Sequence, residues 1–480
     1  MTDGARAGSD PSVRRWSPSL DQLIAATFGL LGVRLGARSI GDNSAFTHLR
    51  TGIDMVRDGL VPAIPRRDPY TFTALNHAWT VQSWLASWFM GWVDRLGGHA
   101  AVITVAALVM GGLAWAVATL ARTGRAQTTA LAGFAALAVG VPFWTPRPLL
   151  VGLLCLVATI AIARTHRSPW LLVPLVWVWV NSHGSFVLGV AWLGATCAGA
   201  WIDRRTGDKT SEPPWAYLGT FAIGLAVSAI NPLGPRLLTF AVTALTKGDV
   251  FRDVIEWQPV NFQRADGFVC LAGLVTSLVI LTRRRLPWRL MLPVVGFLVM
   301  GLYAQRNMAP LGIVLAPVLG DALRPIASIG DRAEFATVNR AFAGVIAVAA
   351  AVFVFSGAVG PPLALADYPV ASIRWLERND RFDAPHRVAT RDTVGNYLEL
   401  RHGARGEVFI DDRVDMFPVS VSDDYSAMLA GGTKGLVAID KWKIDTVLWS
   451  TPSALVDRLR ATGEWDVRFR QREWVVLTRS

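Results

Sequence analysis

The chain has few charged residues and few cysteines for its length. Among its 480 residues, 17% are charged and three are cysteine. Cys155, Cys197 and Cys270 lie far apart in or beside apolar segments, without metal-ligand spacing, so we interpret them as small core residues. The net charge is +11, yet no basic stripe of the kind that binds nucleic acid is visible. These features argue against a cysteine-based metal site and against a nucleic-acid-binding protein.

Long apolar runs are the main feature that is present. Hydrophobic residues make up 52% of the chain, and a run of about 18 or more of them predicts a membrane span. The 20 tryptophans fit this class, because indole prefers the membrane–water boundary. The first apolar stretch has no small-residue cleavage pattern behind it, so we expect it to be retained. We therefore expect an α-helical polytopic membrane protein with about eleven transmembrane helices, near residues 21–37, 99–121, 128–144, 148–164, 169–181, 185–202, 215–231, 266–282, 288–304, 308–323 and 341–358.

The distribution of arginine and lysine predicts which ends of these helices face the cytoplasm. With the N-terminal tail (1–20) inside, the loops on that side carry clusters of positive charge, whereas the short outer loops hold single arginines. An odd number of spans then places the region after the last span outside. The expected domains are the cytoplasmic tail, a transmembrane domain (21–358) in the plasma (inner) membrane, and an extracytoplasmic domain (359–480).

The first outer loop (38–98) is too long for a simple connector. Apolar residues at helical spacing predict an amphipathic helix in its first part. Further on, Trp84, Trp88 and Trp92 lie four residues apart on one face of a second predicted helix. This helix either lies in the membrane interface or packs against neighbouring spans, and the sequence favours neither.

Three side chains of this loop are the candidate chemical groups: Asp42, His48 and Asp68. A carboxylate at the outer mouth of the bundle can act as general base toward an acceptor hydroxyl, or it can bind a divalent metal. The alternative is a solvated loop acid or a helix N-cap, and Asp42 stands where a cap is expected. From spacing alone the structural interpretation is preferred for all three.

Single arginines mark three other outer loops. Arg147 lies in WTPRP, Arg236 follows NPLGP, and Arg306 lies at the mouth of a span. The planar guanidinium suits phosphate recognition, so three such residues from separate loops can hold a lipid phosphate or pyrophosphate. For any one of them, contact with lipid headgroups is the simpler interpretation.

The same loops carry polar and aromatic residues that are suited to a ligand. Asn181 and His183 lie in NSHG, Glu256 and Trp257 form an acid–aromatic pair typical of sugar contacts, and Asn307 follows an arginine. Each of these features is weak alone. Their common side of the membrane is what favours a substrate-binding site.

The region after residue 358 differs in composition, being charged and punctuated by turns. Residues 407–417, 445–450 and 473–479 are predicted strands, and helices are predicted to begin near residue 369 and to follow residue 452. These elements predict a small α/β domain. It has no Gly-rich phosphate loop or dinucleotide-binding fingerprint. The charged cluster Asp411, Asp412, Arg413 and Asp415 is interpreted as a solvated turn.

The order of short motifs along the chain resembles a family of bacterial polytopic membrane proteins related to GT-C-type glycosyltransferases. No single motif is specific, but nine occur in the family's order over nearly the full length. They are DNSAFTHL (42–49), IPRRDPYTFT (64–73), WTVQSWL (79–85), RP (147–148), WVNSHGSF (179–186), NPLG (231–234), EWQP (256–259), RN (306–307) and FIDDRVDMF (409–417).

The resemblance implies a GT-C-like fold and a sugar transfer from a polyprenyl-phosphate-linked donor. It implies that Asp42 is the general base, assisted by Asp68. The sequence departs from the family at Ser44, where a second acid is expected, and at Gln82 and Ser83, where His-Glu is expected. These departures remove possible ligands of a divalent metal, so the metal requirement stays open.

Two hypotheses follow for the function. The first is a membrane glycosyltransferase that moves a sugar from the lipid-linked donor to an extracytoplasmic cell-envelope acceptor, which is a glycan, a lipid or a protein. The second is a non-catalytic membrane protein, either a transporter or flippase of lipid-linked intermediates or a scaffold for envelope assembly. The small number of intramembrane charges counts against a transporter.

Overall fold

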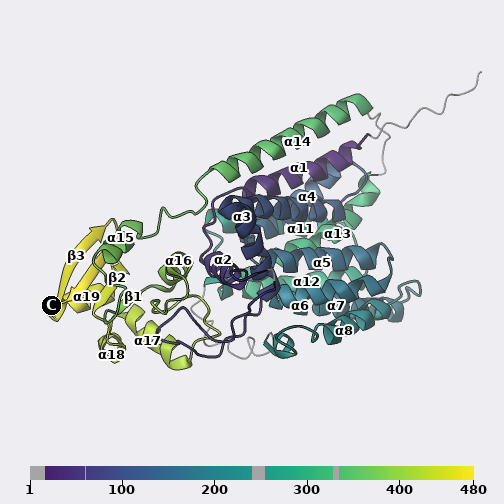
Figure 1. Ribbon diagram of the computed structural model, residues 1–480. Helices are drawn as coiled ribbons and strands as arrows, with labels where there is room; N and C mark the ends of the chain where they lie inside the picture. The colour runs from purple at the N-terminus through teal and green to yellow at the C-terminus, as the bar shows by residue number, and fades with distance from the viewer. Residues whose placement is uncertain (1–16, 60, 241–254, 328–334) are drawn as a thin grey trace, which may run out of the picture.

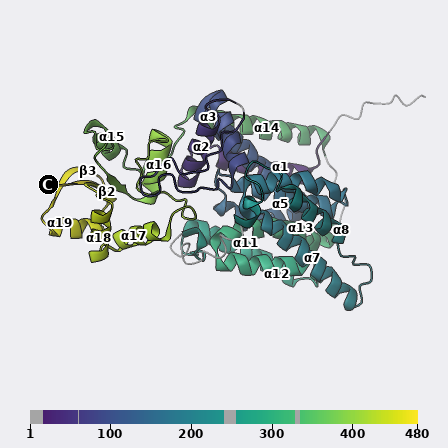
Figure 2. The same cartoon turned by 60° about the horizontal axis from the view of Figure 1, so that its bottom comes forward.

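A computed structural model of the chain describes residues 17–59, 61–240, 255–327 and 335–480. The molecule has two parts, a large helical bundle and a smaller α/β unit formed by the C-terminal region (Figure 1). The unit lies against one end of the bundle, and the first outer loop lies between the two (Figure 2). This arrangement sets the geometry of the candidate site.

Each predicted span coincides with a helix of the bundle. Six helical segments of the described chain are long and apolar enough to cross a membrane, and four apolar helices are shorter. The chain is thus mostly helical with several candidate membrane helices, while the number of eleven crossings stays a prediction. The bundle helices are α1 (Leu20–Gly36), α3 (Trp84–Leu120), α4 (Ala126–Gly140), α5 (Leu149–Arg164), α6 (Leu172–Ser182), α7 (Val187–Arg205), α8 (Trp215–Val227), α11 (Ala265–Thr282), α12 (Trp288–Tyr303), α13 (Met308–Ala327) and α14 (Ala336–Val359).

The helix α3 joins two predicted elements, the tryptophan-bearing helix and the second span. Backbone angles at Gly97 and Gly98 are not helical, so the two halves meet at a kink. Trp84 is 5% exposed and donates from its indole to the side chain of Asn181, 2.8 Å away. Of the two predicted positions for this helix, Trp84 therefore shows packing against neighbouring helices rather than exposure at the membrane interface. The first outer loop therefore passes into helix at its C-terminal end.

The predicted amphipathic helix is confirmed as α2 (Asn43–Met55), with Asp42 as its N-cap. Phe46, Leu49 and Met55 of its apolar face are fully buried, Ile53 is partly buried, and the helix packs closely against α3. A Cβ at Gly52 would lie 1.9 Å from the carbonyl oxygen of Ser87, so only glycine permits this approach. The close contact fixes the side chains of α2 relative to the bundle.

The C-terminal unit contains a four-stranded sheet with strand order β1-β2-β4-β3. Its first pair is parallel and the other pairs are antiparallel. The predicted strands near 445 and 473 and the two predicted helices are confirmed. The elements are α15 (Val370–Arg378), β1 (Val388–Thr390), α16 (Asp392–His402), α17 (Val419–Ala430), α18 (Thr433–Lys441), β2 (Thr446–Ser450), α19 (Ala454–Ala461), β3 (Trp465–Gln471) and β4 (Trp474–Arg479).

The predicted strand at 407–417 is wrong. This segment makes one isolated parallel bridge, between Val408 and Thr71 of the first outer loop. The amide of Phe72 donates to the carbonyl of Val408 at 2.9 Å, and the amide of Val408 donates to the carbonyl of Tyr70 at 3.1 Å. The alternation in the sequence therefore reflects a segment held between two parts of the molecule rather than a member of the sheet.

Candidate functional site

Arg147 is the centre of a polar cluster at the end of the bundle that faces the C-terminal unit. It follows the 3₁₀ turn after α4 and directly precedes the start of α5. Its guanidinium lies 3.6 Å from a carboxylate oxygen of Asp42 and 2.5 Å from one of Glu256. Three loops that are far apart in sequence thus meet here, as the predicted common side of their polar residues requires.

The carboxylate of Asp42 has two roles in this structure. One oxygen accepts a hydrogen bond from the amide of Ala45 at 3.2 Å and caps α2. The other oxygen faces Arg147 across the longer of the two ion pairs. The expectation of an N-cap is confirmed, and the second oxygen is only loosely held. Burial alone would lower the pKa of Arg147, but Asp42 and Glu256 raise it above its ordinary value.

Arg306 lies beside this cluster and stacks on the indole of Trp257, 4.7 Å from the ring centroid. The two loops are tied by the amide of Gln305, which donates to the carbonyl of Gln258 at 2.9 Å. Within the described ranges, the guanidinium of Arg306 has no carboxylate in ion-pair contact. It is half-buried and retains its donors for an anionic ligand.

Two histidines approach the same group of arginines. His48 contacts the hydroxyl of Ser87 at 3.0 Å, and His183 accepts a hydrogen bond from the amide of Ser185 at 3.1 Å. Burial, reinforced by Arg147, lowers the pKa of His48 to about 4. Burial, with the nearby arginines, also lowers the pKa of His183 well below its ordinary value. Both imidazoles are therefore neutral at pH 7, and each can accept or donate a hydrogen bond.

The remaining predicted site residues fall into structural positions. Asn181 is fully buried, accepts from Trp84 and donates to the carbonyl of Trp177 at 2.8 Å. Asn307 donates to the carbonyl of Met300 at 3.0 Å. These bonds hold the loops that carry His183 and Arg306, so both amides position the cluster. Whether they also contact a substrate stays a prediction.

Arg236 is exposed, and in the described part of the chain its side chain makes no ion pair. The preceding turn is organised by Asn231, whose side chain bonds to its own turn. The same turn is tied to the first outer loop, because Arg66 donates to the carbonyl of Pro232 at 2.5 Å. No contact brings Arg236 to Arg147, so its phosphate-binding role stays a prediction.

A second ion cluster surrounds Arg413 and joins the first outer loop to the C-terminal unit. Its guanidinium lies 2.8 Å from Asp68, 3.1 Å from Glu399 and 2.5 Å from Asp411, and all three acids are fully buried. The guanidinium also lies over the ring of Trp79, 4.4 Å from its centroid. The interpretation of this segment as a solvated turn is wrong, because its charges neutralise a buried acid of another segment.

Asp68 is completely enclosed in this second cluster. Besides Arg413, its oxygens accept from the amides of Tyr70 and Thr71 and from the hydroxyl of Thr71. A structural role accounts for every one of these contacts. A role as an assisting catalytic acid stays a prediction, and the burial of the carboxylate gives it no support.

Protonation limits the charge of the second cluster. Burial and the carboxylate of Asp411 raise the pKa of Glu399 well above its ordinary value. Burial alone would raise the pKa of Asp411, but Arg413 holds it below that value. Burial therefore favours the neutral form of Glu399, whose carboxyl group accepts a hydrogen bond from the hydroxyl of Thr47 of α2 at 2.5 Å.

Asp412, which was interpreted as part of a solvated turn, instead lies beside the candidate site. Its oxygens accept from the side-chain amides of Asn43 at 3.2 Å and Asn396 at 2.5 Å, which places it beside the N-cap of α2. Burial and the charge of Asp411 raise its pKa to about 7. Its neighbour Asp411 faces the other cluster, and nothing in one sequence shows which of two adjacent acids faces which partner.

The donor set around Asp42 does not suit a divalent metal. No group of three acidic, histidine or cysteine side chains within the described ranges is arranged to hold a cation. Asp42 is instead paired with Arg147, whose positive charge opposes a metal ion at the same place. The cluster is better suited to an anionic group, which Arg306 and Arg147 can bind while Asp42 accepts a proton.

No family model matches this sequence, and no curated protein matches it. The fold is similar to that of an archaeal oligosaccharyltransferase, AglB from Archaeoglobus fulgidus, solved in complex with an inhibitory peptide and a dolichol-phosphate. The TM-score is 0.51 with 14% sequence identity, and the match covers 89% of this chain and 69% of that one. At this identity the likeness concerns the fold alone.

Proposed function

We propose that the chain is a membrane glycosyltransferase that moves a sugar from a polyprenyl-phosphate-linked donor to an extracytoplasmic cell-envelope acceptor. The observation that carries the proposal is the meeting of Asp42, Arg147 and Arg306 at one end of a GT-C-like bundle. In this proposal the C-terminal unit lies outside the cytoplasm, in line with the arginine distribution. The neighbour's dolichol-phosphate supports a lipid-linked donor by analogy of fold.

The donor phosphate binds to Arg306 and Arg147 in the proposed mechanism. Arg306 has no competing carboxylate in ion-pair contact among the described residues, and its stacking on Trp257 restricts the guanidinium to one plane. Arg147 is held from the opposite side by Glu256. Two oriented guanidinium groups stabilise the charge that develops on the phosphate as it leaves.

Asp42 removes the proton of the acceptor in the same step. Its capping oxygen stays bound to α2, so the other oxygen is positioned and ready to accept the proton. The acceptor oxygen attacks the anomeric carbon, the bond to the donor phosphate breaks, and the phosphate keeps the electron pair. His48 and His183, both neutral, keep further positive charge away from the acceptor side.

The substitution Asp42→Asn tests the role of the base without removing the cap, because asparagine caps a helix as well as aspartate does. We expect sugar transfer to fall by about 10²–10⁴-fold while the thermal midpoint stays the same. Asp266→Asn is the matched control, since Asp266 is another acid in the first turn of a helix, α11, and should keep full transfer.

The assay compares envelope lipids and glycans by mass spectrometry in a deletion strain that carries wild type, Asp42→Asn or the control. A saccharide product that is lost on deletion and restored by wild type alone supports the proposal. If Asp42→Asn restores the saccharide product fully, Asp42 is not the general base. If deletion changes no saccharide and membranes consume no lipid-linked sugar, the enzyme itself is excluded.

One observation favours the non-catalytic alternative, a scaffold or a transporter of lipid-linked intermediates. Asp42 already has a structural use as a cap, and Asp68 is enclosed in an ion cluster. A scaffold would tolerate Asp42→Asn in every readout. The function of a scaffold would instead depend on the contacts that attach the C-terminal unit to the bundle. The transfer assay measures the chemical step and therefore distinguishes the two hypotheses.

A further inference from the structure

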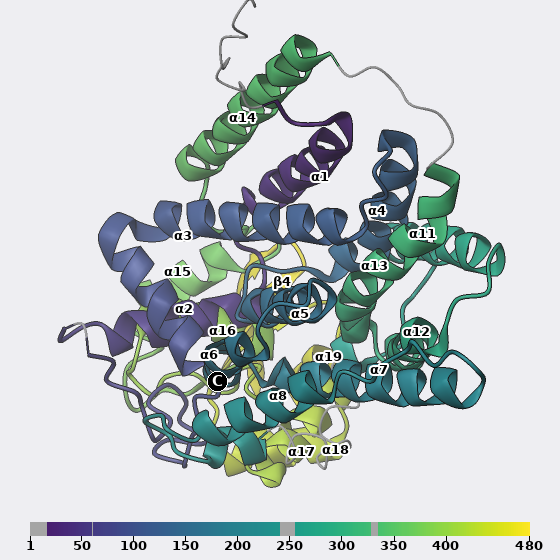
Figure 3. The same cartoon turned by 90° about the vertical axis from the view of Figure 1, so that its right-hand side faces the viewer.

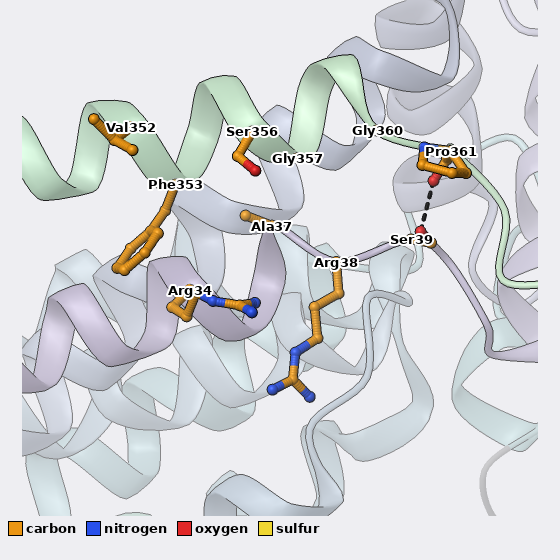
Figure 4. A pocket seen from close by; sticks show the side chains of 10 residues that line it. All are labelled: Arg34, Ala37, Arg38, Ser39, Val352, Phe353, Ser356, Gly357, Gly360 and Pro361. Carbon is orange, nitrogen blue, oxygen red and sulfur yellow. Dashed lines mark hydrogen bonds between the residues drawn. The ribbon is translucent and has the colours of Figure 1, made fainter.

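A cavity of about 590 Å³ lies between the end of α1 and the last two turns of α14, and no residue of the cluster around Arg147 lines it. Figure 4 shows its two walls. One wall carries Arg34, Arg38 and Ser39, and the other carries Phe353 and Ser356. The proposed transfer reaction uses none of these residues. The cavity lies at the same end of α14 as the connection to the C-terminal unit (Figure 1).

The walls of the cavity are held in place by close contacts. A Cβ at Gly357 would lie 2.6 Å from the carbonyl oxygen of Ala37, so α14 crosses the end of α1 at a glycine. Beyond the crossing, the hydroxyl of Ser39 donates to the carbonyl of Pro361 at 2.6 Å. The amide of Ile40 donates to the next carbonyl at 2.9 Å. The cavity is therefore a built feature of the crossing.

The two arginines of the cavity give it an unbalanced positive charge. Arg34 lies in the last turn of α1 and Arg38 in the bend that follows the helix; both are exposed, and no acidic residue is among the residues that line the cavity. Arg34 lies over the ring of Phe353, 5.7 Å from its centroid, which is its one charge-related contact in the described ranges. Two guanidinium groups beside an apolar wall, with no acid among the lining residues, are suited to bind an anion.

The surroundings of the cavity show which anion fits. The helix α14 has no acidic residue and exposes large apolar side chains along its length, including Val345, Val348 and Phe355. In Figure 3, α14 stands at the margin of the bundle and contacts α1. A membrane helix with this exposure faces acyl chains, and the anion at the end of such a helix is a lipid phosphate.

We propose that this cavity binds the phosphate headgroup of one anionic phospholipid, whose acyl chains lie along α14. Arg34 and Arg38 hold the phosphate from one side, and Ser356 donates a hydrogen bond from the other. The lipid fills the space between the two helices beside their crossing. The inference is independent of the proposed transfer reaction, since neither arginine belongs to the cluster around Asp42.

Native mass spectrometry of the purified full chain, titrated with phosphatidylglycerol or phosphatidylcholine, tests this proposal. We expect one phosphatidylglycerol to bind at least tenfold more tightly than phosphatidylcholine. The double variant Arg34→Gln/Arg38→Gln should lose this preference. The matched control is Arg374→Gln/Arg378→Gln on α15, which removes two exposed arginines at the same spacing and should keep it.

A second pair of variants separates the cavity from the charges. Ser356→Phe fills the cavity and leaves both arginines, so it should also abolish the preference, whereas Val345→Phe on the exposed face of α14 should not. Equal binding of the two lipids by wild type, or retained preference in the double variant, overturns the proposal. Equal competition by inorganic phosphate, or replacement by polyprenyl phosphate one for one, overturns the assignment to a phospholipid.

Discussion

The two arginine clusters at the junction of the bundle and the C-terminal unit differ in how far their acidic partners are buried. Arg413 is 8% exposed and contacts three carboxylates that are fully buried. Arg147 contacts two carboxylates, and one of them, Glu256, is 36% exposed. The first cluster is closed and complete, whereas the second is accessible from solvent through Glu256.

This difference separates a structural ion cluster from a candidate binding site. Removing one partner from a buried, fully paired set leaves uncompensated charge, so its loss is a loss of stability. The open set has an accessible acid and lies beside Arg306, which makes no ion pair within the described ranges, so we expect its loss to lower affinity or rate rather than stability. The two sets share no ion pair among the described residues, and each can be tested alone.

Arg413→Met gives the largest expected effect and tests the closed cluster. It leaves the buried carboxylates of Asp68 and Asp411 without a cation, which costs about 3–5 kcal/mol of stability. We expect a lower thermal midpoint and faster proteolysis between the first outer loop and the C-terminal unit. Arg405→Gln is the control and should change the midpoint little, because Arg405 is 65% exposed and its pair with Glu407 is 3.8 Å long. An unchanged thermal midpoint in Arg413→Met would contradict the structural role of the cluster around Arg413.

Arg147→Lys tests the open cluster with the charge kept. Lysine lacks the fork that reaches Asp42 and Glu256 from one group, so we expect about 10–100-fold weaker use of the lipid-linked donor. The thermal midpoint should change much less than in Arg413→Met. Transfer rates over a range of donor concentrations measure the effect. A fall in stability with unchanged donor use would make this cluster structural as well.

His48 allows a test by pH. Its folded pKa of about 4 lies below the ordinary value, so the native state resists protonation and loses stability as pH falls from about 6.5 toward 4. Between pH 7.5 and 5, we expect wild type to lose about 1–2 kcal/mol more than His48→Gln does. Thermal midpoints of both proteins at the two pH values give the comparison. Parallel pH profiles would show that the imidazole is not held neutral.

Asp412 gives the smallest expected effect and lies between the two clusters. Its folded pKa of about 7 is raised, so the native state keeps a proton that the unfolded chain loses, and stability falls as pH rises through 7. Asp412→Asn has no group that titrates here. The free energy of unfolding of the wild type should therefore fall by about 1 kcal/mol relative to that of the variant between pH 6 and 8.5. A constant difference across this range would contradict the raised pKa.

The helical part of the fold was predictable, because apolar runs and helical spacing are local signals. The same holds for the cap at Asp42 and for α2, where the apolar face is read directly from the spacing. The fold of the segment 407–417 was not predictable, since alternation cannot distinguish a sheet strand from a segment bridged to Thr71. The merging of two predicted helices into α3 was missed for a similar reason, because a kinked glycine pair resembles a loop.

The candidate site was predictable only as a set of loops on one side. The alternation of predicted spans grouped Asp42, Arg147 and Arg306 on one side, and the structure brings these three residues near one another, while the membrane side stays a prediction. It could not tell Arg236 from the other arginines, since the contacts depend on how each turn is oriented. The burial of Asp68 also had no local signal, because its counter-charge lies in Arg413, far away in sequence.

The salt link between Asp68 and Arg413 has a consequence for how the protein is made. The ribosome completes the first outer loop early, whereas Arg413 emerges only after every membrane helix has been synthesised. Until then Asp68 lacks its partner, so α2 and its loop cannot adopt their final packing during translation. The ion pairs that join this loop to the C-terminal unit therefore form only after residue 413 has been synthesised.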